Sequence, residues 1–583
     1  MRNSRFFSLL LAFAFASQGV PVAAQTTSPS SAPTMDDAIA AIKAYAPKAL
    51  EQQGAPGMSV AITDRTHTIA IITEGMADVA SKTPVSPDTR FPIGSISKSM
   101  TALALLQLHD KGLVNLNARV QQYLPSWSIH NAGNPILVHM LLSHTGGIPD
   151  DFSFQQYGFA LAALRNAHTL FSPGTMWEYS NDGFATVGAI VAAVSHNSWQ
   201  SNIENHVFAP IGMENSFAVF NDRTLSAPTA TGYQFRDADY VAAPPNPVLV
   251  PSPFVDFVDP AGSVISTPGD MATYIRFYLN GGKTANGTQL LSPATFAAMT
   301  SADHFNNGKP DVAKGIELAE WPAFYHEYGY GLSVFNTNGD RLIGHTGGVS
   351  GYTACFQANL TRGFGAIGLS NLVEAPLHPC AIVKYAMEVL RAQSLGQPLP
   401  PPPAGPPIAP PKITVSDYVG TYRSTDGTGV VVANESGTLS LHDGAKNYQL
   451  VAQGKDVFWT DDPRFTIFYV VFERNKAKAV DGFTNGSSYY VNGKHTGATS
   501  FAHPVAWDRL VGRYETSIFG SPVVMRVVIV KGKLTTDGIN PLRANANGTF
   551  ALGDSTVRFD TLFEGKMQRL WLDGADLYRI ELP

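Results

Sequence analysis

Two patterns of hydrophobic and polar residues, one typical of helices and one typical of strands, divide this chain into segments. From Asp36 to Gln53 the apolar residues are spaced three and four apart, as in an amphipathic helix: Ile39, Ile42, Ala46 and Leu50. Two short runs follow at Met58–Thr63 and Thr68–Thr73, and both read as strands. The chain is therefore predicted to open with a helix and two strands.

A long, mostly helical stretch follows, to about Tyr278, and strands then return. The returning strands are predicted at Gly331–Phe335, Leu342–Gly344, Tyr352–Ala358 and Gly365–Leu369, and a closing helix at Ala381–Gln393. The order helix, strands, helical insert, strands, helix predicts an α/β sandwich in which one sheet is assembled from both ends of the segment.

Prolines interrupt the chain between Gly396 and Pro411. Such a run favours the extended polyproline II conformation and acts as a semi-rigid spacer, so we place the firmest domain boundary here. Beyond it the chain consists of short β runs, such as Val430–Val432, Phe465–Phe472 and Val523–Val530.

An internal repeat marks this β-rich tail. The sequence YVGTY at Tyr418–Tyr422 is echoed by LVGRY at Leu510–Tyr514, and each copy opens a β-rich segment of similar length. Two small antiparallel β-barrels and two halves of one larger barrel both fit this pattern, and we favour two barrels.

The first residues have the pattern of a cleaved secretory signal. Arg2 and Arg5 form a basic region, residues 6–16 an apolar region too short to span a bilayer, and residues 22–24 a small-residue cleavage site. We therefore expect a protein without a membrane span, located in the periplasm or secreted. The Ser/Thr/Pro-rich residues that follow, to about residue 33, are expected to be disordered.

Composition excludes several classes of partner. The 583 residues carry 40 Lys and Arg against 46 Asp and Glu, a formal net charge of −6, without a basic cluster for nucleic acid. The histidines lack zinc-site spacing, so we expect no metal and no cofactor. Only two cysteines occur, Cys355 and Cys380, which can pair in an oxidising compartment; two buried thiols are the alternative.

Ser95 and Lys98 form the only Ser-x-x-Lys tetrad of the chain, and a helix is predicted to begin there. Residues three apart face the same way on a helix, so the hydroxyl and the amine should lie side by side. A neutral amine at hydrogen-bond distance is one way to activate a serine as a nucleophile. Taken alone, the tetrad is also what a solvated helix face contains by chance.

A nucleophilic serine needs a second proton-handling group, a carbonyl clamp and an oxyanion hole. Tyr179 and Asn181 are candidates for the first two, since a tyrosine near cations can exchange protons and an amide can hold a carbonyl. The same Tyr-x-Asn pattern recurs at 278–280 and 490–492, so the motif taken alone is better explained by a buried aromatic residue and a turn asparagine.

His345, Thr346, Gly347 and Gly348 form the third candidate, between a predicted strand and a glycine-rich turn. Small residues on an edge strand let a substrate backbone approach, and Gly348 can offer a backbone N–H to an oxyanion. His-Thr-Gly also occurs at 144–146, where it is predicted to end a helix near the site, and at 495–497 in the β-rich tail.

The order Ser-x-x-Lys, Tyr-x-Asn, His-Thr-Gly resembles the serine β-lactamase and penicillin-binding-protein superfamily. The resemblance covers roughly residues 36 to 394 and is closest to the class C β-lactamase-related branch, which includes peptidase family S12, D-aminopeptidases and family VIII esterases. It extends to further stretches: Phe91–Ser95, Leu141–Gly147, Pro173-Gly174 and Pro260–Met271.

The resemblance implies a serine acyl-enzyme. Ser95 would attack a carbonyl, Lys98 and Tyr179 would share protons with it and with the leaving group, and Asn181 would bind the substrate amide oxygen. The N–H groups of Ser95 and Gly348 would form the oxyanion hole, and the strand residues of the third motif would bind substrate: His345, Thr346 and Gly347.

His345 departs from the Lys-Thr-Gly that is more frequent in this superfamily. Imidazole is largely neutral near pH 7, so the lysine charge that helps bind a substrate carboxylate is missing. This weakens the case for an antibiotic-hydrolysing β-lactamase and favours small peptides as substrates, cleaved at amide bonds. A family VIII type esterase and a non-catalytic penicillin- or peptidoglycan-binding sensor are the alternatives.

The β-rich tail also fits this branch, because a D-aminopeptidase-like enzyme carries two small antiparallel β-barrels there and other relatives a lipocalin-like domain. Such a tail either covers the active-site mouth or serves only stability and assembly. The predicted division is 1–24 signal peptide, 25–35 disordered, 36–395 catalytic domain, 396–412 linker, 413–503 first barrel and 504–583 second barrel.

Overall fold

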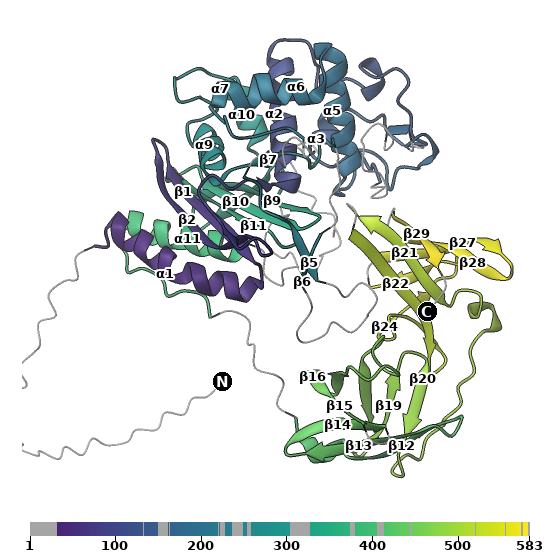
Figure 1. Ribbon diagram of the computed structural model, residues 1–583. Helices are drawn as coiled ribbons and strands as arrows, with labels where there is room; N and C mark the ends of the chain where they lie inside the picture. The colour runs from purple at the N-terminus through teal and green to yellow at the C-terminus, as the bar shows by residue number, and fades with distance from the viewer. Residues whose placement is uncertain are drawn as a thin grey trace, which may run out of the picture.

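The fold was analysed in a computed structural model of the chain (Figure 1). It describes residues 32–131, 133–149, 161–162, 164–219, 221, 228–235, 249–252, 258–302, 327–373, 379–404, 413–443, 446–518, 521–553, 555–572 and 575–580. The predicted signal peptide, most of the segment expected to be disordered, and the later part of the proline-rich linker lie outside these ranges. No helix in the described ranges is long and apolar enough to cross a membrane.

A seven-stranded antiparallel sheet forms the centre of the first part of the chain. Its order is β3-β2-β1-β11-β10-β9-β8. The strands from the N-terminal end are β1 (Gly57–Asp64), β2 (Thr68–Asp78) and β3 (Thr83–Pro84). Those from the C-terminal end are β8 (Ser333–Thr337), β9 (Asp340–Val349), β10 (Tyr352–Asn359) and β11 (Phe364–Ser370). Because β1 pairs with β11, the two ends of the segment share one sheet, as predicted.

Helices cover both faces of this sheet, and alternate strand residues supply the two cores. In β1, Val60 and Ile62 pack with α1 (Met35–Gln53) and α11 (Cys380–Ser394), while Ala61 belongs to the core on the opposite face. In Figure 1, α1 and α11 lie together on one side and the other helices lie across the sheet. The predicted α/β sandwich is confirmed.

The helical insert contains the elements that carry the candidate chemistry. A short 3-10 turn, η1 (Gly94–Ile96), leads directly into α2 (Ser97–Asp110), which packs against α5 (Asn181–Ser195). Around them lie α3 (Val138–Leu142), α6 (Trp199–Ile203), the π-helical η4 (Glu204–Phe208), α7 (Ala209–Ile211), α9 (Pro268–Leu279), α10 (Pro293–Met299), and the 3-10 turns η2 (Val120–Gln122) and η3 (Leu164–Asn166). Two small ribbons join β4 (Phe91–Pro92) with β7 (Ile265–Ser266), and β5 (Tyr233–Phe235) with β6 (Leu249–Pro251).

The tail forms two nine-stranded antiparallel sheets with the same strand order. The first is β15-β14-β13-β12-β20-β19-β18-β17-β16 and the second is β24-β23-β22-β21-β29-β28-β27-β26-β25. In each, the two end strands are neighbours in sequence, so each sheet curls into a nearly closed barrel, and the predicted antiparallel barrels are confirmed. Each barrel encloses its own apolar core.

The first barrel is built from β12 (Gly420–Ser424), β13 (Gly429–Glu435), β14 (Thr438–Asp443), β15 (Lys446–Gln449), β16 (Val451–Gly454), β17 (Val457–Trp459), β18 (Val470–Arg474), β19 (Val480–Asn485) and β20 (Ser488–Val491), after η6 (Val415–Asp417). The second is built from β21 (Gly512–Ile518), β22 (Ser521–Val530), β23 (Lys533–Thr536), β24 (Asn540–Pro541), β25 (Arg543–Ala544), β26 (Phe550–Leu552), β27 (Ser555–Phe563), β28 (Lys566–Leu572) and β29 (Ala575–Ile580), after η7 (Val505–Trp507). One predicted run was too long, since Phe465–Phe472 becomes a strand only from Val470.

Candidate active site

Ser95 lies in the turn that starts the helix α2. Gly94 has a φ of 52° there, a left-handed conformation that glycine adopts without steric cost. This turn brings the chain from β4 into η1 and leaves Ser95 half-buried at the entrance of the helix, while Lys98, one turn later, is fully buried. The predicted pair therefore shares one side of the helix start.

Oxygen atoms of three described residues contact the Lys98 amine. Its Nζ lies 3.0 Å from the Ser95 Oγ, 2.5 Å from the Asn181 Oδ1 and 3.0 Å from the Ala261 carbonyl oxygen. When it gives up its extra proton, the amine can donate two N–H groups to the amide and carbonyl oxygens and direct its lone pair at the serine hydroxyl. The serine and the lysine are thus at the distance that proton transfer requires.

Asp259 shapes the loop that presents the Ala261 carbonyl to Lys98. Its Oδ1 accepts a hydrogen bond of 2.7 Å from the Ala261 N–H, and its own N–H donates to the Ser263 Oγ at 3.0 Å. Burial raises the pKa of the Asp259 carboxyl, and the nearby Lys98 opposes that shift. The loop belongs to the stretch 260–271 that the family resemblance had singled out.

Tyr179 and Asn181 reach the site from the start of α5. Ser180 caps this helix by accepting the Gly183 N–H on its hydroxyl at 2.9 Å, so the two neighbouring side chains stand at a fixed helix end. The Lys98 Nζ lies 4.7 Å from the centre of the Tyr179 ring. The structure therefore brings together four of the predicted residues from two helices that are far apart in sequence.

The third motif lies on β9, where this strand runs past its neighbour. Strand β8 pairs with β9 only as far as Gly344, so residues 345–349 pair with β10 alone among the described strands. The prediction that the third motif lies on an edge strand is therefore wrong for β9 as a whole, because β8 is the last strand of the sheet. Residues 345–349 nevertheless have no strand on their other side among the described residues. The turn η1 lies against β9.

Glycines allow the backbones of η1 and β9 to touch. A Cβ atom at Gly347 would lie 1.9 Å from the Ile93 carbonyl oxygen and 3.2 Å from the Ser95 nitrogen, and one at Gly94 would lie 2.6 Å from the Gly348 nitrogen. The N–H groups of Ser95 and Gly348 are consequently close neighbours. Gly348 is exposed, and no atom of the described residues lies within 4 Å of the place of a Cβ, so among these residues that end of the strand is open to a substrate.

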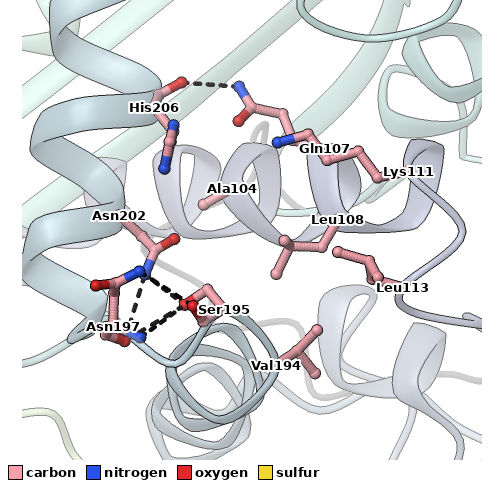
Figure 2. Close-up of a pocket in the computed structure, with 10 residues that line it drawn as sticks. All are labelled: Ala104, Gln107, Leu108, Lys111, Leu113, Val194, Ser195, Asn197, Asn202 and His206. Carbon is pink, nitrogen blue, oxygen red and sulfur yellow. Dashed lines mark hydrogen bonds between the residues drawn. The ribbon is translucent and has the colours of Figure 1, made fainter.

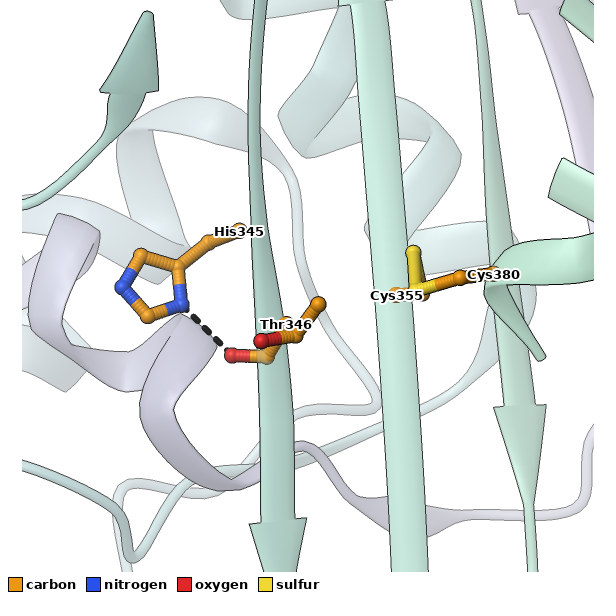
Figure 3. Close-up of a disulfide and its surroundings, with 4 residues drawn as sticks. All are labelled: His345, Thr346, Cys355 and Cys380. Carbon is orange, nitrogen blue, oxygen red and sulfur yellow. Dashed lines mark hydrogen bonds between the residues drawn. A yellow bond between two sulfur atoms is a disulfide. The ribbon is translucent and has the colours of Figure 1, made fainter. Parts of the chain in front are cut away.

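His345 points into the protein and not into the open side of the strand. Only 1% of the residue is exposed, and its Nδ1 lies 2.5 Å from the Thr346 carbonyl oxygen (Figure 3). Its Nε2 lies 2.9 Å from the Tyr328 hydroxyl. A carbonyl only accepts, so Nδ1 carries the proton and the tyrosine donates to Nε2. Burial, and then the charge of Lys98, lower the pKa of His345 to about 3.

The imidazole at the third motif is therefore neutral and engaged at both nitrogens. With Thr346 also buried, the part of this strand that faces outward is its backbone and Gly348. The neighbouring strand is tied down behind it, since Cys355, the register partner of Thr346, forms a disulfide with Cys380 at the start of α11 (Figure 3). Of the two alternatives for the cysteines, the structure contains the bridge.

A cluster of aromatic rings behind the site includes a residue that the sequence had assigned only to a helix end. His144 lies 4.4 Å from the Tyr179 ring, 4.8 Å from Tyr328 and 5.1 Å from Phe184, between ring centres. The left-handed φ of 60° at His144 agrees with the predicted helix terminator after α3. Nothing in the sequence pattern identified Tyr328 or the packing of these rings.

A cavity of about 220 Å³ lies elsewhere, between the later parts of α2 and α5 (Figure 2). Its wall includes Gln107 and Asn202, whose side chains already bond the His206 carbonyl and the Ser195 hydroxyl. None of the candidate catalytic side chains lines it, so we do not assign the chemistry to this cavity. Within the described residues, no group of three or more His, Cys, Asp or Glu side chains could hold a metal ion.

Comparison with known proteins identifies the family. The model of the family described as Beta-lactamase matches residues 36–382, more than half of the chain, and the chain belongs to this family, whose members are generally serine hydrolases. Penicillin-binding protein 4 of Amycolatopsis lactamdurans is 25% identical over 382 residues, which are 64% of this chain and 94% of that protein. Protein flp of Staphylococcus aureus strain N315 is 24% identical over 334 residues, 55% of this chain and 61% of that protein.

Two solved structures share the fold. The octameric penicillin-binding protein homologue from Pyrococcus abyssi has a TM-score of 0.53 and 22% identity, over 78% of this chain and 100% of that chain. The β-lactamase/D-alanine carboxypeptidase from Yersinia pestis, in complex with citrate, has a TM-score of 0.50 and 18% identity, over 62% of this chain and 100% of that chain. These two likenesses support the predicted fold.

Proposed function

We propose that this chain is a serine hydrolase that cleaves amide bonds of small peptides through an acyl-enzyme on Ser95. The observation that carries the proposal is the 3.0 Å contact between the Ser95 Oγ and the Lys98 Nζ, in a chain of the β-lactamase family. Asn181 and Ala261 accept from the same amine, and in its neutral form the amine can take the serine proton on its lone pair.

In the acylation step Ser95 attacks the substrate carbonyl and its proton passes to Lys98. The carbonyl oxygen becomes an oxyanion that the N–H groups of Ser95 and Gly348 stabilise. The Asn181 Oδ1 is held by Lys98, which orients the amide so that its NH₂ group is the part that donates to a substrate carbonyl. Water then releases the acyl group by the reverse proton path.

The proton-handling pair favours amides as substrates. An amine leaves a tetrahedral intermediate only after it is protonated, whereas an aryl oxide leaves without this help. In the proposed mechanism such a proton comes from Lys98 and from Tyr179, whose ring centre lies 4.7 Å from the Lys98 Nζ, and this role supports a peptidase more than an esterase. The neutral His345 supports substrates that need no cation at the third motif.

We also propose that the enzyme is exported to the periplasm or secreted. The signal pattern of residues 1–24 supports this, and so does the disulfide between Cys355 and Cys380, because disulfides persist in oxidising compartments. Intact mass of the protein recovered from the culture of an expressing host should show cleavage near residue 24. A full-length mass in the reducing cytosol would contradict export.

The proposed nucleophile is tested with a fluorophosphonate probe. The wild-type chain and Ser99→Ala should be labelled, and Ser95→Ala should not. Ser99 is the matched control because it lies on the same helix but bonds the Ile96 carbonyl and the Tyr274 hydroxyl. Labelling that persists in Ser95→Ala would refute Ser95 as the nucleophile.

The substrate class is tested in parallel on D- and L-amino acid amides, p-nitrophenyl esters and a chromogenic cephalosporin. We expect amide turnover that Ser95→Ala abolishes, with the acyl group visible by mass on Ser95. Turnover of esters alone would make the chain a family VIII type esterase. Strong cephalosporin turnover without amide hydrolysis would contradict the peptidase, and no labelling or turnover at all would favour a sensor.

A further inference from the structure

His144 holds the segment that carries Tyr179 at two points. Its carbonyl oxygen accepts the Glu178 N–H at 2.9 Å, and its Nδ1 accepts the Ser180 N–H at 3.0 Å. The residue between these two bonds is Tyr179. A side chain that merely ended helix α3 would need no bond to a segment more than 30 residues later in the chain.

These bonds determine the state of the imidazole. Because an N–H donates to Nδ1, this nitrogen carries a lone pair, and the proton of the neutral ring is on Nε2. Burial, followed by the charge of Lys98, lowers the pKa of His144 well below its usual value. The buried Nε2 has no hydrogen-bond partner in the part of the chain that the structure describes.

The ring also packs directly on the residues of the site. Its centre is 4.4 Å from the Tyr179 ring, inclined by 36°, and 4.8 Å from Tyr328, the tyrosine that bonds His345. The imidazole thus touches both the proposed proton carrier and the support of the third motif. A buried polar nitrogen without a partner costs free energy, which a purely structural apolar ring would not incur in the same place.

We propose that His144 is a positioning residue that sets the orientation of Tyr179 toward Lys98 and Ser95. This inference rests on the proposed function, because it assigns His144 a role in the same acylation step. The side chain acts twice: Nδ1 fixes the backbone on the C-terminal side of Tyr179, and the ring restrains the tyrosine ring. A displacement of about 1 Å of a catalytic group from its reactive position lowers the reaction rate about 100-fold.

Three variants separate positioning from helix termination. His144→Gly and His144→Asn both tolerate a left-handed φ, so both suffice for a helix terminator. Asn places an oxygen near the position of Nδ1 and can accept the Ser180 N–H, whereas Gly cannot. His196 provides the matched control, because it ends α5 in the same left-handed conformation, φ 57°, but is exposed.

The test measures how fast the fluorophosphonate probe phosphonylates Ser95 of the full chain, with loss of fluoride, between pH 5 and pH 10. We expect His144→Gly to react with the probe about 100-fold more slowly than wild type and with a displaced pH profile. His144→Asn should recover at least 10-fold of that loss, and His196→Gly should match wild type. Equal rates for wild type and His144→Gly would overturn the proposal, as would equal rates for Gly and Asn.

A double-mutant cycle shows whether His144 acts through Tyr179. In a Tyr179→Phe background the effect of His144→Gly should shrink to less than 3-fold; an undiminished effect would overturn the proposal.

Thermal unfolding followed by circular dichroism confirms that each variant is folded. If His144→Gly is unfolded, the comparison of His144→Asn with His144→Gln decides the question, since only Asn mimics Nδ1. If Ser95→Ala or Tyr179→Phe reacts with the probe at the wild-type rate, the proposed function itself fails. This outcome is distinct from a failure of the role proposed for His144.

Discussion

At the scale of single residues, the site depends on buried histidines that stay neutral. His345 has a pKa of about 3 in the folded protein because of burial and Lys98, against about 6.5 in an unfolded chain. Between these values the unfolded state binds the extra proton, so stability rises with pH through this window. The stabilisation is complete above about pH 6.5 and is lost as the pH falls toward 3.

This sign gives the first prediction. Acidification from pH 6.5 to 4.5 should cost about 2 kcal/mol of unfolding free energy through His345. His345→Gln keeps an acceptor for the Tyr328 hydroxyl but does not titrate, so its urea-unfolding free energy should fall by about 2 kcal/mol less over the same interval. His130→Gln, an exposed histidine, is the control. An equal acid sensitivity of His345→Gln and wild type would contradict the assignment.

Sequence reasoning reached the polar site residues but not what surrounds them. Four candidate residues lie in short motifs whose spacing can be recognised in the sequence, and the structure brings them together: Ser95, Lys98, Tyr179 and Asn181. The direction of the His345 ring depends on Tyr328, a contact between distant segments that no local pattern records. The positioning role proposed for His144 likewise depends on a contact with a distant segment, at Ser180, so the local sequence does not predict it.

At the scale of elements, the site exists because two backbones touch. The turn η1 and the open half of β9 approach so closely that Gly347 has no room for a side chain, its Cβ lying 1.9 Å from the Ile93 carbonyl oxygen. Gly347→Ala must therefore push the strand away from Ser95. We expect a lower melting temperature and at least a 100-fold loss of acylation, since the oxyanion donors separate.

Gly348→Ala is the matched comparison for stability, because in the part of the chain that the structure describes no atom lies within 4 Å of its Cβ position. Its melting temperature should equal that of wild type within about 1 °C, whatever the added methyl does to substrate binding. The steric argument fails if Gly347→Ala is as stable and as active as wild type.

The disulfide acts at the same scale, by joining strand β10 to helix α11. Cys355 and Cys380 are 25 residues apart, and closing such a loop restricts the unfolded chain. The double variant Cys355→Ala/Cys380→Ala should lose about 3 kcal/mol in urea unfolding, yet retain Ser95 labelling at 20 °C. Unchanged stability, or a loss of labelling in the folded variant, would contradict a purely structural role.

Elements were predictable where one period dominated. The helix α1 and the strands β1, β10 and β11 were expected within a few residues of their observed bounds, because burial imposes a clear period on each. The position of β9 inside the sheet was not, since β8 pairs with only half of it. Such partial pairing depends on the relative length of neighbouring strands, which hydrophobic patterns do not encode.

At the scale of the whole molecule, the tail repeats one design twice. The motif copies open the two barrels at equivalent places, because Tyr422 and Tyr514 each donate a 2.8 Å hydrogen bond to the carbonyl oxygen four residues earlier, at Tyr418 and Leu510. The repeat predicted from the sequence is therefore a repeated structural bond as well as a repeated strand order. The sequence pattern does not show that each barrel is nearly closed. This closure needs the pairing of β12 with β20 and of β21 with β29, which are far apart in the sequence.

The two barrels also contact each other through charged and aromatic side chains. Lys531 of the second barrel lies 2.5 Å from the Glu473 carboxylate and 4.4 Å from the centre of the Tyr489 ring, both in the first barrel. The ion pair is partly exposed and contributes little by itself, whereas the stacked cation adds apolar contact. The barrels thus support one another.

The repeated tyrosine separates a stabilising tail from one that takes part in catalysis. Tyr422→Phe and Tyr514→Phe each keep a fully buried ring but leave a backbone carbonyl without its donor, which costs about 1–2 kcal/mol. Each should lower the melting temperature of the tail, while Tyr448→Phe, from a partly buried ring, should not. Acylation of Ser95 below the transition should match wild type in all three, because every candidate catalytic residue precedes the tail. A fall in acylation with the tail still folded would instead show that the barrels shape the active-site mouth.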